Sequence, residues 1–278
     1  MLSVILSTYN SPAWLRKVLW GYAAQSVKSF EIVIADDGSR DETADAIRAL
    51  RGELGVPLTH VWQEDDGFQK SRILNKAILA AKTDYLLFSD GDCIPRADFV
   101  ETHLRLRKPG HFLSGGYFKL PMDISQAISR DDIAGQRAFS YDWLVAHGMD
   151  RTHKGLKLRA SPLARRILNS VTPTRATWNG HNASTWKALA EKVNGFDERM
   201  QYGGQDREFG ERLVNLGVKP IQIRYSAVCI HLDHKRGYAV PESIARNRAI
   251  RKFTRRSGIT RTEFGLDQHK AASLILRS

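Results

Sequence analysis

Short apolar runs alternate with amphipathic segments along the first third of the chain. Strands are predicted at residues 2–6, 30–35, 58–62 and 85–88, where apolar residues are nearly continuous. Between these runs apolar side chains recur every three or four residues, as on one face of a helix. Such alternation predicts an α/β fold with a Rossmann-like, mostly parallel central sheet flanked by helices, because parallel strands need crossover connections.

Two of the helices carry predicted start signals. Ser11 and Pro12 supply an N-cap and a first-turn proline, and Ser39 and Glu42 have the spacing of a capping box. Both helices begin shortly after a strand ends. The loops at the carboxyl ends of the strands should therefore gather along one edge of the sheet, where α/β folds bind ligands.

The strand at 85–88 leads directly into two acids. Asp90 and Asp92 flank Gly91, and Pro95 prevents the strand from continuing. Two carboxylates at a strand end can bind a hard cation such as Mg²⁺ or Mn²⁺ that bridges phosphates, and the glycine allows close approach of a ligand. Alternatively, the two aspartates only terminate the strand, as Asp does in many turns.

Two basic residues stand in the first turn of a predicted helix. Lys70 and Arg72 occupy a position where the helix dipole disfavours cations. Either they bind a phosphate together with the helix N-terminus, or they extend into solvent.

Two later segments add an acid and imidazoles. Asp206 stands at the start of a predicted helix, where it acts in chemistry or simply stabilises the helix end. His231 and His234 follow a strand at 227–230. A spacing of three favours one metal ligand with a neighbour, or a surface pair, over two ligands.

The net charge of +12 is concentrated in two segments. Residues 151–178 contain seven Lys or Arg and no acid, and residues 241–278 contain nine Lys or Arg and three acids. The first lies in a stretch, 121–178, that predicts irregular helices and loops after a strand with a glycine bend at 111–117. The distribution indicates an anionic partner: a phospholipid surface, a lipid diphosphate or a nucleic acid.

The second basic segment predicts a helix at 241–256. Ala245, Ala249 and Phe253 form a thin apolar stripe flanked by arginines. The stripe either docks on the domain or lies at a membrane surface, held there by charge.

Composition indicates a globular chain with room for a sizeable core, since 42% of its 278 residues are apolar. No run of about 18 apolar residues occurs, and Met1 leads directly into a strand. We therefore expect a cytoplasmic protein, peripheral at the inner face of the membrane if the basic helix binds there. Cys93 and Cys229 fit a reducing compartment as small apolar residues.

These segments, in this order, resemble family 2 glycosyltransferases with the GT-A fold. The likeness rests on residues 7–10, 34–41 and 72–77 and on Asp90-Gly91-Asp92. Residues 194–197 and 203–206 are similar to the acceptor-side motif that bacterial members share with animal galactosyltransferases. Together they span roughly residues 2–110 and 178–236. Gln205 stands where the family usually has Glu.

The resemblance implies roles for individual residues. It makes Asp206 the catalytic base, and it makes Asp92 and His231 ligands of Mn²⁺ or Mg²⁺. The implied nucleotide-binding residues are Ser7, Tyr9, Asp37, Lys70, Arg72 and Asp90. The implied acceptor-side residues are Trp178, Gly204, Gln205 and His234.

The resemblance, together with the charge pattern outside the shared core, predicts an organisation. Residues 1–92 form a nucleotide-binding half and 93–240 a metal and acceptor half with the basic insertion 121–178, while 241–278 form a basic helical extension. The expected reaction is a metal-dependent, inverting transfer from a nucleoside-diphosphate sugar, with a UDP-sugar favoured. The acceptor is a hydroxyl of a saccharide or lipid-linked saccharide, in bacterial surface polysaccharide synthesis.

Two other functions are compatible with parts of the pattern. A sugar nucleotidyltransferase usually opens with a glycine-rich basic loop, which residues 7–11 lack. A basic membrane-binding or nucleic-acid-binding module would explain the charge. No zinc spacing, aromatic RNA motif or recognition helix supports sequence-specific nucleic-acid binding.

Overall fold

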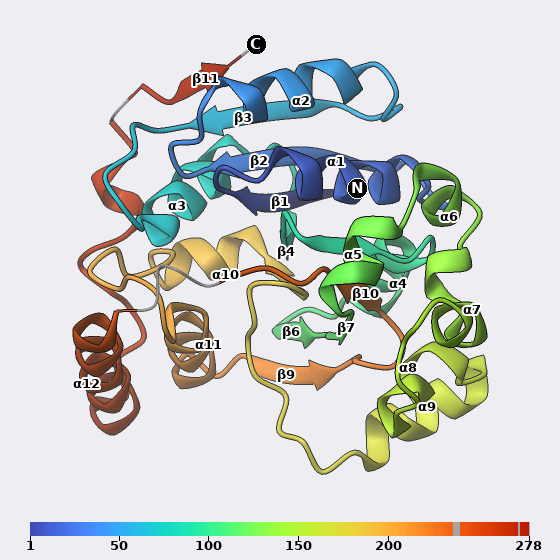
Figure 1. Cartoon of the computed structure of the whole chain (residues 1–278). Coiled ribbons are helices and arrows are strands. Elements are labelled where there is room, and N and C mark those ends of the chain that lie inside the picture. The colour runs from blue at the N-terminus through green and yellow to red at the C-terminus, as the bar shows by residue number, and fades with distance from the viewer. Residues whose placement is uncertain (236–239, 272, 278) are drawn as a thin grey trace.

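An eight-stranded sheet runs through the centre of the protein (Figure 1). The computed structural model describes residues 1–235, 240–271 and 273–277. The strand order is β11-β3-β2-β1-β4-β8-β6-β9, and a second sheet has the order β5-β10-β7.

The first four strands confirm the predicted parallel arrangement. β1 pairs with β2 and β4, and β2 pairs with β3, all in parallel. The strands are β1 (Leu2–Thr8), β2 (Phe30–Asp36), β3 (Leu58–Trp62) and β4 (Tyr85–Asp90). The helices that connect them are α1 (Pro12–Ala23), α2 (Asp41–Arg51) and α3 (Lys70–Ala80). Their loops meet at one edge, and Ser7 of β1 lies opposite Asp90 of β4.

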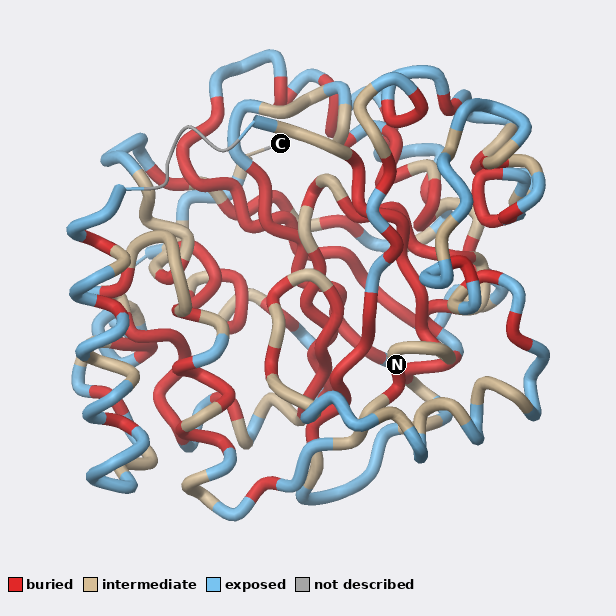
Figure 2. Tube along the Cα trace, turned by 60° about the horizontal axis from the view of Figure 1, so that its bottom comes forward, coloured by how far each residue is buried: buried red, intermediate tan, exposed pale blue. Residues whose placement is uncertain are grey.

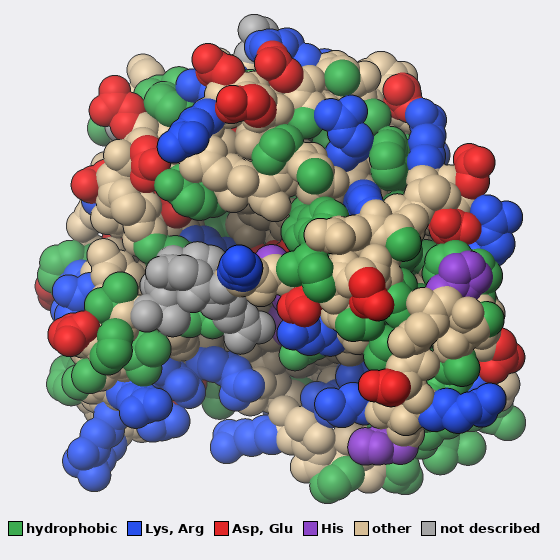
Figure 3. All heavy atoms as spheres, viewed as in Figure 1, with side chains coloured by type: hydrophobic (Ala, Val, Ile, Leu, Met, Phe, Trp, Pro, Cys, Tyr) green, Lys and Arg blue, Asp and Glu red, His purple; other side chains and the backbone are tan. Residues whose placement is uncertain are grey.

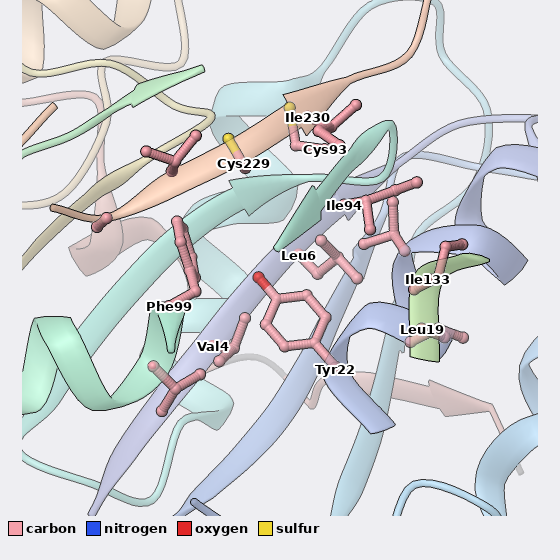
Figure 4. Close-up of a cluster of buried hydrophobic side chains, with 14 of the residues drawn as sticks. Val4, Leu6, Leu19, Tyr22, Cys93, Ile94, Phe99, Ile133, Cys229 and Ile230 are labelled. Atoms are coloured by element: carbon pink, nitrogen blue, oxygen red, sulfur yellow. The ribbon is translucent and has the colours of Figure 1, made fainter. Parts of the chain in front are cut away.

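The core lies on both faces of this sheet, since side chains alternate along each strand. Val4 and Leu6 face α1 and α2, whereas Ile5 and Val33 face α3, α10 (Lys187–Lys192) and α11 (Gln205–Asn215). Figure 2 shows buried residues concentrated along the strands. Figure 4 shows part of the first cluster, which includes Tyr22 and both cysteines. The cysteines are buried and unpaired, as predicted.

The glycine bend predicted at 111–117 carries the chain from one sheet to the other. β6 (His111–Ser114) belongs to the large sheet with β8 (Ala183–Trp186) and β9 (Lys219–Gln222). β7 (Gly116–Lys119) belongs to the small sheet with β5 (Cys93–Pro95) and β10 (Val228–His231). Between them lies Gly115, where a Cβ atom would come within 2.0 Å of Asn182 Oδ1.

Asn182 links the two sheets through hydrogen bonds. Its Nδ2 donates to the backbone oxygens of Gly116 and Ala227 at 2.8 and 3.0 Å, and its Oδ1 lies 3.0 Å from His103 Nε2. His103, from α4 (Phe99–Leu106), also contacts Ser184 Oγ at 2.7 Å. Burial lowers the pKa of His103 to about 4, so the imidazole is neutral and donates to the amide.

The segment 121–178 forms short helices, in agreement with prediction. They are α5 (Met122–Ala127), α6 (Arg130–Ala134), α7 (Tyr141–Ala146), α8 (Leu156–Arg159) and α9 (Pro162–Val171), with single 3₁₀ turns at Arg137–Phe139 and His153–Gly155. Lys17 of α1 anchors the first of them. Its Nζ donates to three backbone oxygens at the end of α5, each at 2.8 Å, and a cation is favoured at a helix C-terminus.

The last helix, α12 (Pro241–Ser257), does not dock on the domain through its apolar stripe, which was one of the two alternatives predicted. The predicted apolar stripe faces solvent, and Phe253 is 61% exposed. The buried residues are polar instead. Asn247 donates to the backbone oxygens of Gln201 and Tyr202, and Thr254 donates to Glu208 of α11 at 2.9 Å. Hydrogen bonds, which a periodicity of apolar residues does not register, hold the helix in place.

The sequence predicted a helical extension at 241–278, but the end of the chain also contains a strand. After α12 and a 3₁₀ turn at Leu266–Gln268 comes β11 (Ile275–Arg277). This strand pairs antiparallel with β3 and so covers the edge of the central sheet. The C-terminal segment is therefore integrated into the large sheet.

The predicted N-cap residue and first-turn proline of α1 are confirmed, whereas the predicted capping box of α2 is wrong. The residue at the N-cap of α2 is Arg40, and Ser39 lies one position earlier. Ser39 Oγ instead accepts from the backbone nitrogen of Asn10 at 2.8 Å, which ties two loops of the sheet edge together. Ser11 occupies the N-cap of α1 without a side-chain hydrogen bond. Contacts between loops override local capping here.

Gly115→Ala should lower the free energy of unfolding by about 1–3 kcal/mol, as overpacking in a rigid environment does. The added methyl group meets Asn182, which three hydrogen bonds hold in place. Urea denaturation measures the effect. Gly52→Ala is the control, since nothing lies within 4 Å of its added Cβ, and stability should stay level or rise by up to about 1 kcal/mol. Equal effects of both substitutions would contradict the packing at Gly115.

Candidate active site

Lys70 lies at the centre of the sheet edge, surrounded by acids. Its Nζ donates to Asp90 Oδ1 at 2.6 Å, and Ser7 Oγ donates to the same oxygen at 2.8 Å. Burial alone would lower the pKa of Lys70, but the charges of Asp90, Asp206 and Asp92 outweigh it and raise the pKa. The ion pair explains why a lysine occupies a helix start that the dipole disfavours.

Asp90 responds to the same pair from the other side. Burial would raise the pKa of its carboxyl, but the charge of Lys70 outweighs burial and lowers the pKa to about 2. Asp90 is therefore an anion at neutral pH, held by two hydrogen bonds at the end of β4.

Asp92 and two histidines form a cluster that can hold a cation. Asp92 Oδ2 lies 3.1 Å from His234 Nε2 and 3.9 Å from His231 Nε2. The sequence favoured His231 as a ligand and placed His234 on the acceptor side. The structure brings both to Asp92, because the chain bends after β10 and the two rings stack 5.5 Å apart.

The tautomers of these histidines suit metal binding. Each Nδ1 lies against a backbone carbonyl oxygen, of Leu232 at 2.8 Å for His231 and of Lys235 at 2.9 Å for His234. A carbonyl only accepts, so each neutral ring carries its proton on Nδ1 and directs the Nε2 lone pair at the cluster. The donor set fits a divalent cation, and imidazole nitrogens favour a transition ion such as Mn²⁺ over Mg²⁺.

Asp206 lies at the start of α11, inside the same edge of the sheet. Burial raises the pKa of its carboxyl, with Lys70 opposing and Asp90 adding to the effect. Its Oδ1 is buried and has no hydrogen-bond partner. A Cβ atom at Gly180 would lie 2.8 Å from both carboxylate oxygens, so glycine is needed there for the close approach. An unsatisfied buried carboxylate oxygen is a candidate proton acceptor.

Asp37 is buried at the end of β2. Gln63 Nε2 donates to one carboxylate oxygen at 2.7 Å, and the backbone nitrogen of Gln69 donates to the other at 2.9 Å. Burial raises the pKa of Asp37 to about 7 despite these bonds and the charge of Lys70. Tyr9 is half exposed, and its hydroxyl donates to Asp65 at 2.8 Å.

Four residues that the resemblance assigned to nucleotide or acceptor binding make other contacts in the structure. Arg72 lies 3.6 Å from both Asp66 and Glu198, so it points away from the Lys70 and Asp90 pair. The Trp178 ring is buried among Phe88, Phe112 and Phe209 and has no face open to an acceptor. Gln205 Oε1 accepts from the backbone of Gly203, and Gly204 is the left-handed N-cap of α11.

His181 was not predicted as a site residue from the sequence. Burial lowers the pKa of this imidazole to about 4, although Asp90 and Asp92 oppose the shift, and the ring packs edge-on against Tyr117 at 4.7 Å. It is therefore a neutral group that interacts with Asp90, Asp92 and His231. A lone histidine in a loop has no spacing partner, and only its place directly after Gly180 could have drawn attention to it.

The space-filling view shows a hollow on this face of the protein (Figure 3). Acidic and histidine side chains appear at its base, and Lys and Arg side chains gather below it and over α12. Among the described residues, no helix combines the length and apolar character that crossing a bilayer requires.

Known sequences and a family model show what this chain is similar to. Residues 3–114 match the sequence model of glycosyl transferase family 2. The chain is 26% identical over 238 residues to chondroitin synthase from Escherichia coli, covering 78% of this chain and 32% of that protein. It is 28% identical over 240 residues to hyaluronan synthase from Pasteurella multocida, covering 78% and 23%. The chain thus spans a third or less of these relatives.

Solved structures share the fold at low sequence identity. The S. aureus protein TarS, residues 1–349 with UDP-GlcNAc, superposes with a TM-score of 0.60 at 18% identity, over 90% of this chain and 65% of that one. The mannosyltransferase PcManGT from Pyrobaculum calidifontis, with GDP-Man and Mn²⁺, gives a TM-score of 0.56 at 19% identity, over 93% and 71%.

Asp37→Asn should raise the melting temperature at about pH 8 and have a smaller effect at about pH 5. A carboxyl whose pKa rises on folding binds more protons in the folded chain, so its ionisation costs stability as the pH climbs from about 4 to about 7. Asparagine removes that cost. Thermal unfolding at both pH values measures the difference.

The exposed Asp84→Asn serves as the control and should change little at either pH. A lower melting temperature of Asp37→Asn than of the wild type at about pH 8 would show that ionisation of the buried carboxyl does not cost stability.

Proposed function

We propose that the chain is a family 2 glycosyltransferase that transfers a sugar from a nucleoside-diphosphate sugar to an acceptor hydroxyl, since residues 3–114 match that family's model and the fold is shared with solved glycosyltransferases. The observation that carries the proposal is the gathering of four acids around one lysine. Lys70 acts electrostatically on Asp37, Asp90, Asp92 and Asp206, which come from two strand ends and a helix start. A binding half, a cation site and a base thus share one edge of the sheet.

The donor is held by residues 1–92. Asp37 accepts from the nucleotide base, Tyr9 packs against it, and Ser7 and Asp90 lie toward the ribose. Lys70 faces the diphosphate, since its ammonium is the buried cation nearest these acids. A UDP-sugar is favoured, and TarS, with the same fold, has UDP-GlcNAc bound.

The leaving diphosphate needs positive charge as the glycosidic bond breaks. Asp92, His231 and His234 are the residues that hold a divalent cation, with Mn²⁺ favoured by the two imidazoles. When bound, such a cation stabilises the negative charge that develops on the phosphate oxygens. His181 is neutral, so it does not repel a cation held by these residues.

Asp206 takes the proton from the attacking hydroxyl. Its raised pKa makes it a better base than an exposed aspartate, and its unpaired Oδ1 is free to accept that proton. Attack opposite the leaving group inverts the configuration at the sugar. Residues 93–240 thus supply the base and the two histidine ligands of the cation. By likeness to chondroitin and hyaluronan synthases, the product is a bacterial surface polysaccharide.

The outer face of α12 is proposed to rest on an anionic membrane at the cytoplasmic side, where lipid-linked acceptors lie. Arg248, Lys252 and Arg256 are exposed on this face, and Phe253 stands 61% exposed at its border. Basic residues beside an exposed aromatic ring suit a surface of acidic lipid headgroups. The buried side of the helix is occupied by its hydrogen bonds to the domain.

Asp206→Asn should reduce sugar transfer by about 10²–10⁴-fold, the range typical of general bases, while leaving UDP affinity nearly unchanged. The amide preserves shape and removes the proton acceptor. Transfer to an oligosaccharide and UDP titration are measured on the same preparation. Transfer at the wild-type rate would exclude Asp206 as the base.

Neutralising the outer face of α12, with Arg248→Gln, Lys252→Gln and Arg256→Gln combined, should abolish salt-sensitive binding to phosphatidylserine vesicles. Sedimentation with the vesicles measures it. Substitution is preferred to truncation because removing 241–278 would also remove Asn247, Thr254 and β11.

The matched control for the vesicle experiment loses three charges elsewhere: Arg16→Gln, Lys82→Gln and Arg105→Gln, all exposed. The control should bind vesicles as the wild type does. Equal loss in both triple variants would mean that overall charge, and not α12, governs binding.

A further inference from the structure

A large basic groove lies beside the acids described above. It has a volume of about 1170 Å³ and is bounded by β7, the 149–157 segment, the loop before Trp178, and helices α11 and α12. His181 and Arg207, the residue after Asp206, belong to its lining, so the groove adjoins the proposed base. It exceeds the usual size of a pocket for one small molecule, roughly 300–1,000 Å³.

The lining is strongly cationic. Eight Lys or Arg and two acids contribute to it. Three of the cations are paired, Arg251 and Arg255 with Glu211 and Lys119 with Asp233. The other five have no carboxylate partner among the described residues: Lys154, Lys157, Arg175, Arg207 and Arg224.

Two of these cations are partly buried, which makes their lack of a counter-charge costly. Arg224 Nε is buried and without a hydrogen-bond partner. Lys157 is half buried and donates to the backbone oxygen of Tyr117 at 2.8 Å. Burial, with Arg224 adding to it, lowers the pKa of Lys157. Cations held together without an anion destabilise a fold, so a ligand that supplies the negative charge is the simplest function for them.

We propose that this groove binds the acceptor and that the acceptor is an anionic saccharide bearing carboxylate or phosphate groups. The inference rests on the proposed glycosyl transfer, because it assigns the groove to the substrate that reaches Asp206. Tyr117, 37% exposed in the lining, adds apolar surface against which a sugar packs, with Lys157 Nζ 5.8 Å from the centre of its ring. The site is concave and lies between elements, whereas the membrane-facing residues of α12 point outward.

The test uses three oligosaccharides that share one backbone: maltoheptaose, its C6-oxidised uronate form and its C6-phosphorylated form. Each is titrated calorimetrically into the full chain with saturating UDP and Mn²⁺. One or both anionic forms should bind at least tenfold more tightly than maltoheptaose, and the advantage should shrink as salt is added, since salt screens exposed charges. Comparison of the two anionic forms tells carboxylate from phosphate recognition.

Variants locate the binding in the groove. Lys154→Gln combined with Arg175→Gln should weaken anionic binding at least tenfold and leave UDP binding unchanged, since both side chains are exposed and unpaired. Lys154→Arg combined with Arg175→Lys keeps the charge and should bind normally. Arg16→Gln combined with Lys82→Gln, outside the groove, is the matched control and should also bind normally.

The possible failures are distinguishable. Normal UDP binding with equal affinity for neutral and anionic saccharides, or with no loss in the groove variant, overturns the anionic acceptor and leaves the transfer activity standing. Absence of UDP binding overturns the proposed function itself. Tighter binding of oligothymidylate than of any saccharide, lost in the groove variant, would assign the groove to nucleic acid and overturn the inference.

Discussion

The architecture of the site depends on one partly buried ion pair, between Lys70 and Asp90. Burying either charge alone would be strongly unfavourable, and the helix dipole opposes a lysine at the start of α3. At 2.6 Å the two charges offset each other, and the hydrogen bond from Ser7 fixes the carboxylate in register with β1. The pair thereby holds α3 against the end of β4. Asp92 follows two residues after that end, and its carboxylate faces His231 and His234.

This pair leaves negative charge in excess around it. Asp37, Asp92 and Asp206 all interact with the single ammonium of Lys70, and burial raises the pKa of Asp37 and Asp206. A cation beside Asp92 would offset part of that negative charge. The Nε2 lone pairs of His231 and His234 point toward the same place. On the other side of Asp206 the excess charge is positive, because lysines and arginines without carboxylate partners line the adjoining groove. The boundary between these two fields is where a diphosphate donor and an anionic acceptor would meet.

Much of this arrangement could be predicted from the sequence, for identifiable reasons. Nearly continuous apolar runs marked the four parallel strands. The prediction that Pro95 ends the strand was wrong, because β4 already ends at Asp90 and Pro95 lies in β5, where it pairs with Cys229 of β10. What the sequence could not supply were interactions between distant residues. The partner of Lys70 lies 20 residues away, and Ser39 serves Asn10 instead of its own helix. The polar docking of α12 and the pairing of β11 with β3 depend on surfaces that exist only after folding. His234 was placed on the acceptor side because the bend after β10 has no signature in residue spacing.

The measurement closest to the central claim is calorimetric titration of UDP, with and without Mn²⁺, into the wild type and into Asp92→Ala. A cleft in which acids position a cation against a diphosphate predicts that Mn²⁺ strengthens UDP binding to the wild type by at least tenfold and that Asp92→Ala abolishes this gain. Binding of UDP that is the same with and without Mn²⁺, in both proteins, would contradict the account.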